Sequence, residues 1–143
     1  MSQNFKKTVL FVDDDEDDYM LMRDTFKERH PEIDLLWTRD GEEALDYLKR
    51  RGRFREAARP YLMLLDLNMP KLNGQEVLKQ IRSDEGICHI PVVVLTNSMN
   101  KEEVTEAYCR GVNSFIRKPA GYKELRSFVE TFGKYWFEYS TLV

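Results

Sequence analysis

Three carboxylates, a hydroxyl group and an ammonium group stand where short apolar runs of the sequence end. Asp13 and Asp14 follow the first run, Asp66 the third, Thr96 the fourth and Lys118 the fifth. Carboxylates and a neighbouring main-chain carbonyl are hard oxygen ligands of the kind that Mg²⁺ prefers. A lysine and a threonine beside them can contact phosphoryl oxygens through an ion pair and a hydrogen bond. These residue types indicate phosphoryl chemistry assisted by a divalent cation.

The acids would repel one another strongly if all were ionised at close range, and a bound divalent cation removes that conflict. Asp66 is the central candidate because it directly follows Leu62–Leu65, one of the clearest apolar runs. A carboxylate there is a candidate nucleophile that would form an acyl phosphate. Each residue alone has a simpler explanation, since Asp14 or Asp15 can cap a helix and the threonine and lysine can be turn and surface residues. Their joint placement after different runs favours a shared site.

Five short apolar runs rich in β-branched residues provide the framework for this site. Runs that are apolar on both faces are typical of strands in a buried parallel sheet. The predicted strands are Thr8–Val12, Ile33–Trp37, Leu62–Leu65, Val92–Leu95 and Ser114–Ile116.

Helical periodicity separates these strands, with apolar or small residues at i, i+3, i+4 and i+7 that predict a core-facing helix side. The stripes are Gly41, Ala44, Leu45 and Leu48; Gly74, Val77, Leu78 and Ile81; and Val104, Ala107, Tyr108 and Gly111. A first helix is expected to follow the acid run, with Asp17 and Asp18 in its first turn, where negative charge is favourable, and a last helix is expected near the end. Their predicted inward residues are Tyr19, Met22 and Phe26, then Leu125, Phe128, Val129, Phe132 and Trp136. Asp40 with Glu43, and Asn100 with Glu103, have capping-box spacing.

Strand–helix alternation, repeated five times, predicts an α/β fold: a (βα)5 doubly wound parallel sheet with right-handed crossovers and helices on both faces. No linker or repeat divides the 143 residues, so we expect one domain over 1–143, with a core of about 6–134 and a C-terminal aromatic extension over 135–143. Ligands of open α/β sheets bind at the carboxyl ends of the strands. The fold would therefore bring the acids, Thr96 and Lys118 to one edge.

Composition and charge exclude several function classes. The net charge is −3 and the run Asp13–Asp18 holds six acids, which argues against a globally basic nucleic-acid binder. The basic stretch 49–59 is expected to be a solvated helix end and loop. No apolar run approaches the ~18 residues of a membrane span. Without an export signal, Cys88 and Cys109 are expected to be reduced thiols, which predicts a cytoplasmic protein.

The segments around these residues resemble the receiver domain of two-component response regulators. "VLFVDDD" is similar to the first strand with its acidic pair, and "LMLLDLNMPKLNG" to the phosphoacceptor strand and loop. "PVVVLTNS" resembles the strand of the switch threonine, and "SFIRKP" the last strand with its Lys-Pro pair. The resemblance covers nearly the whole chain. It implies the flavodoxin-like strand order 2-1-3-4-5, which chemotaxis receivers also have.

The resemblance implies a metal and a phosphoryl role for the acidic residues. Asp66 would accept a phosphoryl group from a histidine kinase or a phosphotransfer protein. Asp14 would ligate Mg²⁺ directly, Asp13 would do so directly or through water, and Asn68 would offer its main-chain carbonyl. The protein would then be a phosphorylated signalling switch and not an enzyme that turns over a substrate.

The resemblance also implies which residues respond to phosphorylation. Lys118 would pair with the phosphoryl oxygens, and Thr96 would move to bond the phosphorylated group. Phe115 would move inward behind it as an aromatic switch. The Lys118–Pro119 peptide is expected to be cis. Asn97 departs from the family pattern, in which a small residue is usual after the switch threonine, and this leaves the phosphoryl lifetime open.

A closer resemblance concerns small stand-alone receivers associated with bacterial phytochromes and hybrid sensor kinases. The segments "YLKRRGRFREAARPYLMLLDLNMP" and "FGKYWFEYSTLV" are similar to theirs. It implies a sensor histidine kinase of phytochrome or hybrid type as partner, and a homodimer through the fourth helix, last strand and last helix. The surplus aromatic residues Tyr135, Phe137 and Tyr139 are compatible with such a patch, the alternative being an intramolecular lid.

Other function classes fit the sequence less well. An aspartyl phosphatase of the haloacid-dehalogenase kind would share the lysine and acids, but the DxDx[Thr/Val] spacing is absent and there is no room for a cap domain. A phosphorylation-independent interaction module would not need the complete set of site residues. Direct nucleic-acid binding is not expected, because no helix-turn-helix or basic domain follows the receiver.

Overall fold

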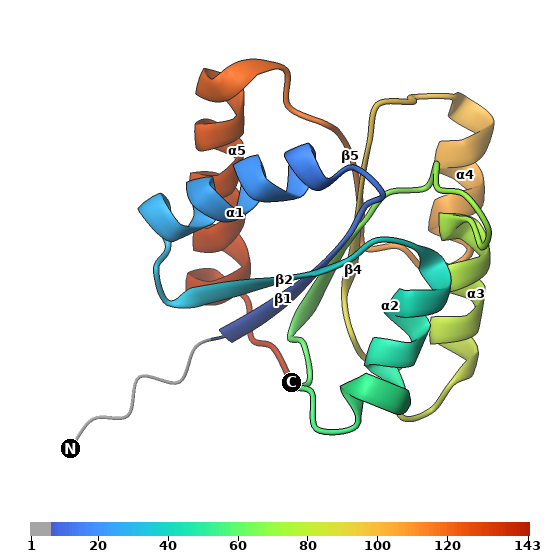
Figure 1. The fold of residues 1–143 in the computed structure, drawn as a ribbon. Helices are drawn as coiled ribbons and strands as arrows, with labels where there is room; N and C mark the ends of the chain where they lie inside the picture. The colour runs from blue at the N-terminus through green and yellow to red at the C-terminus, as the bar shows by residue number, and fades with distance from the viewer. Residues whose placement is uncertain (1–6) are drawn as a thin grey trace.

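The computed structural model describes residues 7–143, so the first six residues of the predicted domain, including the expected start of the core at residue 6, lie outside the described residues. The strands are β1 (Lys7–Val12), β2 (Ile33–Thr38), β3 (Leu62–Leu65), β4 (Val92–Thr96) and β5 (Ser114–Arg117). The α-helices are α1 (Glu16–Arg29), α2 (Gly41–Leu48), α3 (Gly74–Ser83), α4 (Lys101–Cys109) and α5 (Gly121–Lys134) (Figure 1). A 3₁₀ turn at Gly52–Phe54 and a π-helical turn at Tyr135–Tyr139 complete the elements.

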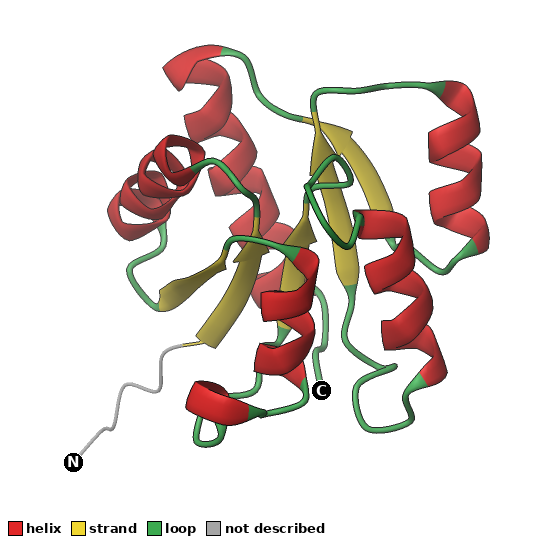
Figure 2. Ribbon diagram, turned by 45° about the vertical axis from the view of Figure 1, so that its right-hand side comes forward, coloured by secondary structure: helices red, strands yellow, loops and turns green. Residues whose placement is uncertain are grey.

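The five strands form one parallel sheet in the order β2-β1-β3-β4-β5, as predicted. Every residue of β3 and β4 is buried, which agrees with their continuous apolar sequences. Because all strands are parallel, their carboxyl ends meet at a single edge of the sheet (Figure 2). This edge is where the sequence places its chemistry-bearing side chains.

Helices cover both faces of the sheet and divide the core into two clusters. One cluster joins α1 and α5 to the sheet through residues such as Phe26 and Phe132, whose rings meet edge to face at 5.8 Å. The other cluster lies under α2, α3 and α4. Figure 1 shows the same division, with α1 and α5 together on one side and the remaining helices on the other.

The predicted helical stripes are confirmed for α2 and α3 but not for α4. All four stripe residues of α2 and all four of α3 are buried. In α4 only Ala107 is buried, and Tyr108 is 50% exposed, so the prediction that Tyr108 faces the core is wrong. Gly111 lies beyond the helix end with a φ of 93°, a left-handed conformation that glycine tolerates without a steric cost. The helical spacing of apolar residues predicted that a helix forms here, but it did not determine how deeply the helix packs against the sheet.

The acid run is divided among a strand end, a helix cap and a helical turn. Asp15 is the N-cap of α1, and its side chain accepts hydrogen bonds from the main-chain N–H groups of Asp17 and Asp18. Helix α1 therefore starts at Glu16, within the acid run, and Asp17 and Asp18 lie in its first turn as predicted. Acidic residues in a first turn are favoured by the helix dipole, which explains why the helix can begin among like charges.

The basic stretch after α2 is an ordered, solvated loop, as expected. Tyr47 closes it by donating a hydrogen bond from its hydroxyl group to the carbonyl of Ala58 at 2.7 Å. The ring of Tyr47 packs edge to face on Phe54 at 5.2 Å. Across the part of the chain that the structure describes, no helix is long and apolar enough to cross a membrane.

Candidate functional site

The sheet holds the main chain of Asp13, Asp66 and Lys118 one position beyond strands β1, β3 and β5, and Thr96 is the last residue of β4. The N–H group of Asp13 donates to the carbonyl of Thr38, and that of Asp66 donates to the carbonyl of Val12 at 3.0 Å. The N–H group of Lys118 donates in the same way to the carbonyl of Thr96 at 2.8 Å. Hydrogen bonds of the parallel ladder therefore continue into the turns, and they fix where the site side chains begin.

Three of the predicted acids lie together at this edge. Asp13, Asp14 and Asp66 each present a carboxylate oxygen, and these oxygens all lie within 4.8 Å of one another. Asp13 is 1% exposed and Asp66 is 7% exposed, whereas Asp14 is exposed. The cluster thus combines two buried carboxylates with one that reaches solvent.

Lys118 joins the acids from the last strand. Its ammonium nitrogen lies 2.7 Å from Oδ2 of Asp13, 3.2 Å from Oδ2 of Asp66 and 3.1 Å from Oδ2 of Asp18. The contact with Asp18 was not predicted, because its position indicated only a favourable charge in a first helical turn. The structure shows in addition that this acid extends from the helix to the lysine.

Burial and charge act on this group of residues in opposite directions. Burial raises the pKa of Asp13 above its usual value, and the nearby charge of Asp66 adds to this, although Lys118 and the N–H group of Asp15 act against it. For Lys118, burial alone would lower the pKa, but the carboxylates of Asp13, Asp66 and Asp18 outweigh it and the pKa is raised. Lys118 therefore stays a cation and compensates part of the local negative charge.

Thr96 is connected to the acidic loop through Asn68. Thr96 has no exposed surface, and its hydroxyl oxygen accepts a hydrogen bond from the side-chain amide of Asn68 at 3.1 Å. The main-chain N–H group of Asn68 donates to Oδ1 of Asp66 at 3.0 Å. Sequence reasoning assigned Asn68 only a main-chain role, so this side-chain bridge between the third and fourth strands is a new feature of the site.

The loop after Asp66 packs so closely on α3 that only glycine fits at the start of that helix. A Cβ atom on Gly74 would lie 2.7 Å from the Cα of Leu67 and 2.8 Å from the main-chain oxygen of Asp66. Its main-chain N–H group donates to the carbonyl of Leu67 at 3.1 Å. A side chain at this position would have to push the Asp66 turn away from the helix.

Trp37 supports the acidic turn from β2, and no sequence pattern singled it out. Its indole N–H donates to the main-chain carbonyl of Asp13 at 2.7 Å. Its ring stacks on that of Tyr19, with 5.1 Å between centroids and 9° between planes. Tyr19 in turn donates from its hydroxyl group to the carbonyl of Leu35 at 3.1 Å. This chain of contacts ties the Asp13 turn to both β2 and α1.

Two further predicted features concern the last strand. Phe115 is half-buried against the core cluster under α2, α3 and α4. The expected cis peptide between Lys118 and Pro119 is wrong, because the structure describes no cis peptide bond among residues 7–143. The trans form is the ordinary preference of an X–Pro bond, and Lys118 reaches its carboxylate partners with the peptide in that form.

The residues present fit a divalent cation. Three carboxylates supply hard oxygen ligands within a few ångströms of one another. Within the described part of the chain, Oδ2 of Asp13 is buried without a hydrogen bond of normal geometry and has only the ion pair with Lys118. A buried carboxylate oxygen in this state is available to a cation, and the clustered negative charge would favour one.

Comparison with known proteins agrees with this site. The family described as "Response regulator receiver domain" matches residues 9–130. Response regulator Rcp1 of Synechocystis sp. is 37% identical over 139 residues, covering 97% of this chain and 95% of the relative.

Solved structures show the same similarity. The phosphorylated cyanobacterial phytochrome response regulator RcpA has a TM-score of 0.90 and 36% identity, covering 96% of this chain and 98% of that one. The Mn²⁺-bound form of Rcp1 has a TM-score of 0.88 and 36% identity, covering 96% of this chain and 99% of that one. With its acids, threonine and lysine gathered at the carboxyl ends of a 2-1-3-4-5 sheet, this chain belongs to the response regulator receiver domain family and has a role in phosphorelay signalling.

Proposed function

We propose that Asp66 is the phosphoacceptor of this receiver and takes its phosphoryl group from a phosphohistidine of a histidine kinase or phosphotransfer protein. The observation that carries this proposal is the contact of the Asp66 carboxylate with Lys118, within the cluster formed with Asp13 and Asp14. An attacking carboxylate beside a fixed cation is well placed for in-line transfer, in which positioning and charge neutralisation supply most of the rate.

In the proposed transfer, a carboxylate oxygen of Asp66 forms a bond to phosphorus while the bond from phosphorus to the donor nitrogen breaks. The donor imidazole leaves and takes up a proton, so no water is consumed. Hydrolysis later reverses the modification, since a water molecule takes the phosphoryl group and leaves free Asp66 and inorganic phosphate. The protein assists both steps on itself, and it turns over no separate substrate as an enzyme would.

The metal of this site is proposed to be Mg²⁺, held by Asp13, Asp14, Asp66 and the main-chain carbonyl of Asn68. When bound, it would neutralise charge on phosphoryl oxygens and on the acids themselves. Hard oxygen donors favour Mg²⁺ over softer metals, and the Mn²⁺-bound form of Rcp1 supports a divalent cation in this chain as well. Asp13 is buried and already paired with Lys118, while exposed Asp14 can turn toward a hydrated ion.

Lys118, Thr96 and Phe115 are proposed to convert phosphorylation into a conformational signal. Lys118 would contact the phosphoryl oxygens, for which its raised pKa keeps it charged. Thr96 would exchange its hydrogen bond with Asn68 for one to the phosphorylated group. Phe115, half-buried against the core, would then move inward behind it. Such a switch biases two existing arrangements and requires no new chemistry.

The test is labelling by a small phosphodonor. Wild type incubated with acetyl phosphate and Mg²⁺ should gain one phosphoryl group in its intact mass, and Asp66→Asn should gain none. Asp24→Asn, which removes an exposed acid of α1, is the matched control and should label like wild type. Undiminished labelling of Asp66→Asn would refute the assignment, and repeated turnover of phosphomonoesters would instead favour an aspartyl phosphatase.

The proposed partner is a sensor histidine kinase of phytochrome or hybrid type. The similarity to the phytochrome response regulator RcpA and to Rcp1 supports it. A cytoplasmic receiver of one domain over residues 1–143, with no direct contact to nucleic acid, fits this partner. Phosphotransfer from a purified phytochrome-type kinase at a rate far above that from an unrelated kinase would test the choice.

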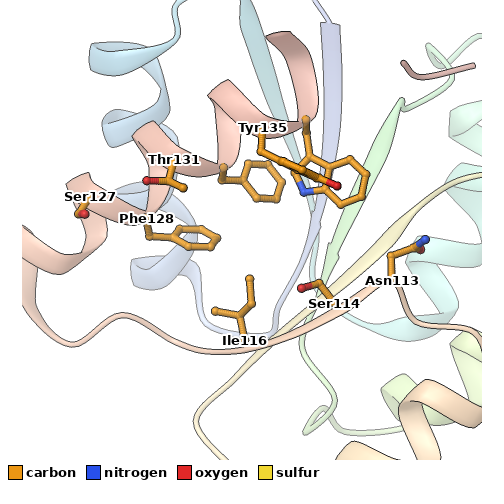
Figure 3. A pocket seen from close by; sticks show the side chains of 9 residues that line it. Asn113, Ser114, Ile116, Ser127, Phe128, Thr131 and Tyr135 are labelled. Atoms are coloured by element: carbon orange, nitrogen blue, oxygen red, sulfur yellow. The ribbon is translucent and has the colours of Figure 1, made fainter. Parts of the chain in front are cut away.

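A homodimer is proposed through α4, β5, α5 and the C-terminal aromatic residues. A groove of about 590 Å³ lies between β5 and α5, with Ile116, Phe128 and Tyr135 among its lining residues (Figure 3). Tyr135 is 55% exposed and Tyr139 is 71% exposed, which leaves a surplus of aromatic surface beside the edge strand. Exposed aromatic surface of this kind is typical of an interface.

Sedimentation velocity of both phosphorylation states tests the dimer. Tyr135→Glu combined with Tyr139→Glu should yield a monomer, because the added charges would be buried at the interface. Met20→Glu on α1, where another large apolar side chain is exposed, is the matched control and should leave the dimer intact. A wild type that stays monomeric in both states would favour an intramolecular lid.

A further inference from the structure

The three carboxylates around Lys118 differ in how firmly the fold holds them. The side chains of Asp13 and Asp66 are 1% and 8% exposed, and both residues are anchored at strand ends by main-chain hydrogen bonds. The side chain of Asp18 is 43% exposed and extends from the first turn of α1. Asp18 is therefore the partner that can leave Lys118 by rotating into water.

Lys118 has no spare donor for a further anion in this arrangement. An ammonium group has three N–H donors, and three carboxylate oxygens lie within 3.2 Å of its nitrogen. A phosphoryl group on Asp66 takes over the contact that the Asp66 carboxylate makes, and its further oxygens compete with Asp13 and Asp18 for the same cation. Withdrawing the cation from Asp13 would leave a buried charge uncompensated, whereas Asp18 gives up only a half-exposed ion pair.

We infer that Asp18 is a positioning residue that competes for Lys118 and so weakens the binding of phosphoryl groups at Asp66. It acts only through the lysine and does not contact the reacting atoms. The inference rests on the proposed function, because it requires Asp66 to be the phosphoacceptor. Its consequence is that the rate of phosphorylation is set partly by an acid outside the group of residues on which the family resemblance depends.

A general effect of negative charge must be separated from this specific contact, since Asp18 belongs to a run of acids. Asp17 provides the matched control: it lies one residue earlier in the same turn and is exposed. The side chain of Asp17 takes part in none of the ion pairs and hydrogen bonds described for residues 7–143. Only its main-chain N–H group has a partner near the site, because it donates to the side chain of the N-cap Asp15. Asp17→Asn and Asp18→Asn therefore remove the same charge, but only the second removes a contact with Lys118.

The experiment measures binding of beryllofluoride, an anionic mimic of the phosphoryl group, in the presence of Mg²⁺. Bound fluoride is followed by ¹⁹F NMR at about 0.15 M salt, where the Debye length of about 8 Å screens distant charges more than contacts. Asp18→Asn should bind about fivefold more tightly than wild type, the factor that loss of a partly exposed ion pair corresponds to. Asp17→Asn should stay within about twofold of wild type.

Labelling by acetyl phosphate gives a second readout. The bond from phosphorus to the acetyl oxygen breaks, acetate leaves, and Asp66 gains the phosphoryl group. Asp18→Asn should label about fivefold faster than wild type at low donor concentration, again with Asp17→Asn as control. Both variants should still unfold cooperatively in EDTA, because the Asp15 cap of α1 remains in each.

The following results would overturn the inference. Equal increases in beryllofluoride affinity for the two variants would show a general effect of negative charge. An unchanged or lower affinity of Asp18→Asn would show that Asp18 does not compete for the lysine. A wild type that neither binds beryllofluoride nor labels at Asp66 would overturn the proposed function together with this inference. A wild type that does both, with no selective gain in Asp18→Asn, would overturn the inference alone.

Discussion

Helices α3 and α4 are of similar length and lie on the same side of the sheet, yet they are held very differently. Helix α3 buries four residues, and its first glycine lies against the Asp66 turn. Helix α4 buries only Ala107, and Tyr108 on it is 50% exposed. Local stability in proteins varies with such packing, and elements that move are drawn from the weakly packed regions.

This contrast divides the site into a fixed half and an adjustable half. Asp66 belongs to the fixed half, because its turn is confined by α3 and by the ladder hydrogen bond to Val12. Thr96 leads into the segment before α4, whose residues 97–100 are exposed or half-buried. Phosphorylation would therefore leave the turn around Asp66 in place and change the conformation of the segment after β4. The following predictions test that division, from the largest expected effect to the smallest.

Truncation of the core should cost far more in α3 than in α4. Ile81→Ala removes a side chain with no exposed surface and should lower the free energy of unfolding by about 3 kcal/mol. Val104→Ala in α4, where the side chain is only half-buried, should lower it by less than about 1 kcal/mol. Urea denaturation of both variants measures the difference, and equal losses would contradict the division into two halves.

The turn that carries Asp13 should depend on Trp37. Trp37→Phe retains an aromatic ring against Tyr19 but removes the N–H donor to the Asp13 carbonyl. Because outer contacts of a metal site orient its ligands, the Mg²⁺ affinity should fall by about tenfold. Trp136→Phe, which changes the other tryptophan of the chain, is the control for calorimetric titration. A Trp37→Phe protein with wild-type affinity would show that the indole does not fix the turn.

Tyr47 gives a pH-dependent test on the side of α2 and α3. Burial raises the pKa of Tyr47 to about 12, with the charge of Asp34 adding to the effect. The folded pKa lies above the unfolded value near 10, so this stabilisation is complete below pH 10 and is lost as the pH rises toward 12.

Tyr47→Phe has no phenol to ionise, so its stability relative to wild type should increase between pH 9 and pH 11, by about 1.4 kcal/mol. It should be less stable at pH 7 by about 1 kcal/mol, because the hydrogen bond to Ala58 is lost. Urea denaturation across this pH range measures both. A stability difference that does not change with pH would contradict the raised pKa.

Asp13 should oppose folding when no cation is bound. Burial raises its pKa, so the protonated form favours the fold, and this contribution is lost as the pH rises through the folded pKa. Asp13→Asn should therefore unfold at a slightly higher temperature than wild type in EDTA at neutral pH. In excess Mg²⁺ wild type should instead unfold at a higher temperature than Asp13→Asn, since wild type gains stability from binding the cation. A lower unfolding temperature for Asp13→Asn in EDTA would show that the ion pair with Lys118 dominates.

The framework of the fold could be predicted from the sequence because it depends on local patterns. The buried strands were continuous apolar runs, and the Asp40 and Asn100 caps had recognisable spacing, which the structure confirms through bonds to the N–H groups of Glu43 and Glu103. Since parallel strands end at one edge, the meeting of Asp13, Asp14 and Asp66 followed from their positions.

The remaining features depend on distances across elements, which periodicity does not determine. Asp18 and Lys118 are 100 positions apart, and nothing local to Asp18 indicates that it reaches the lysine. Trp37 looked like a strand residue, while its function in the structure is the hydrogen bond to the Asp13 turn. The misplaced Tyr108 has the same origin, since a stripe gives the direction of a side chain but not the depth of its burial.

The most direct test of the proposed phosphoacceptor is to locate the phosphoryl group on the chain. After reaction with acetyl phosphate and Mg²⁺, borohydride reduction converts an aspartyl phosphate to homoserine, which peptide mass spectrometry can assign to one position. We predict homoserine at position 66 and at no other aspartate. Modification of Asp13, Asp14 or any other acid in place of Asp66, or no modification at all, would contradict the assignment.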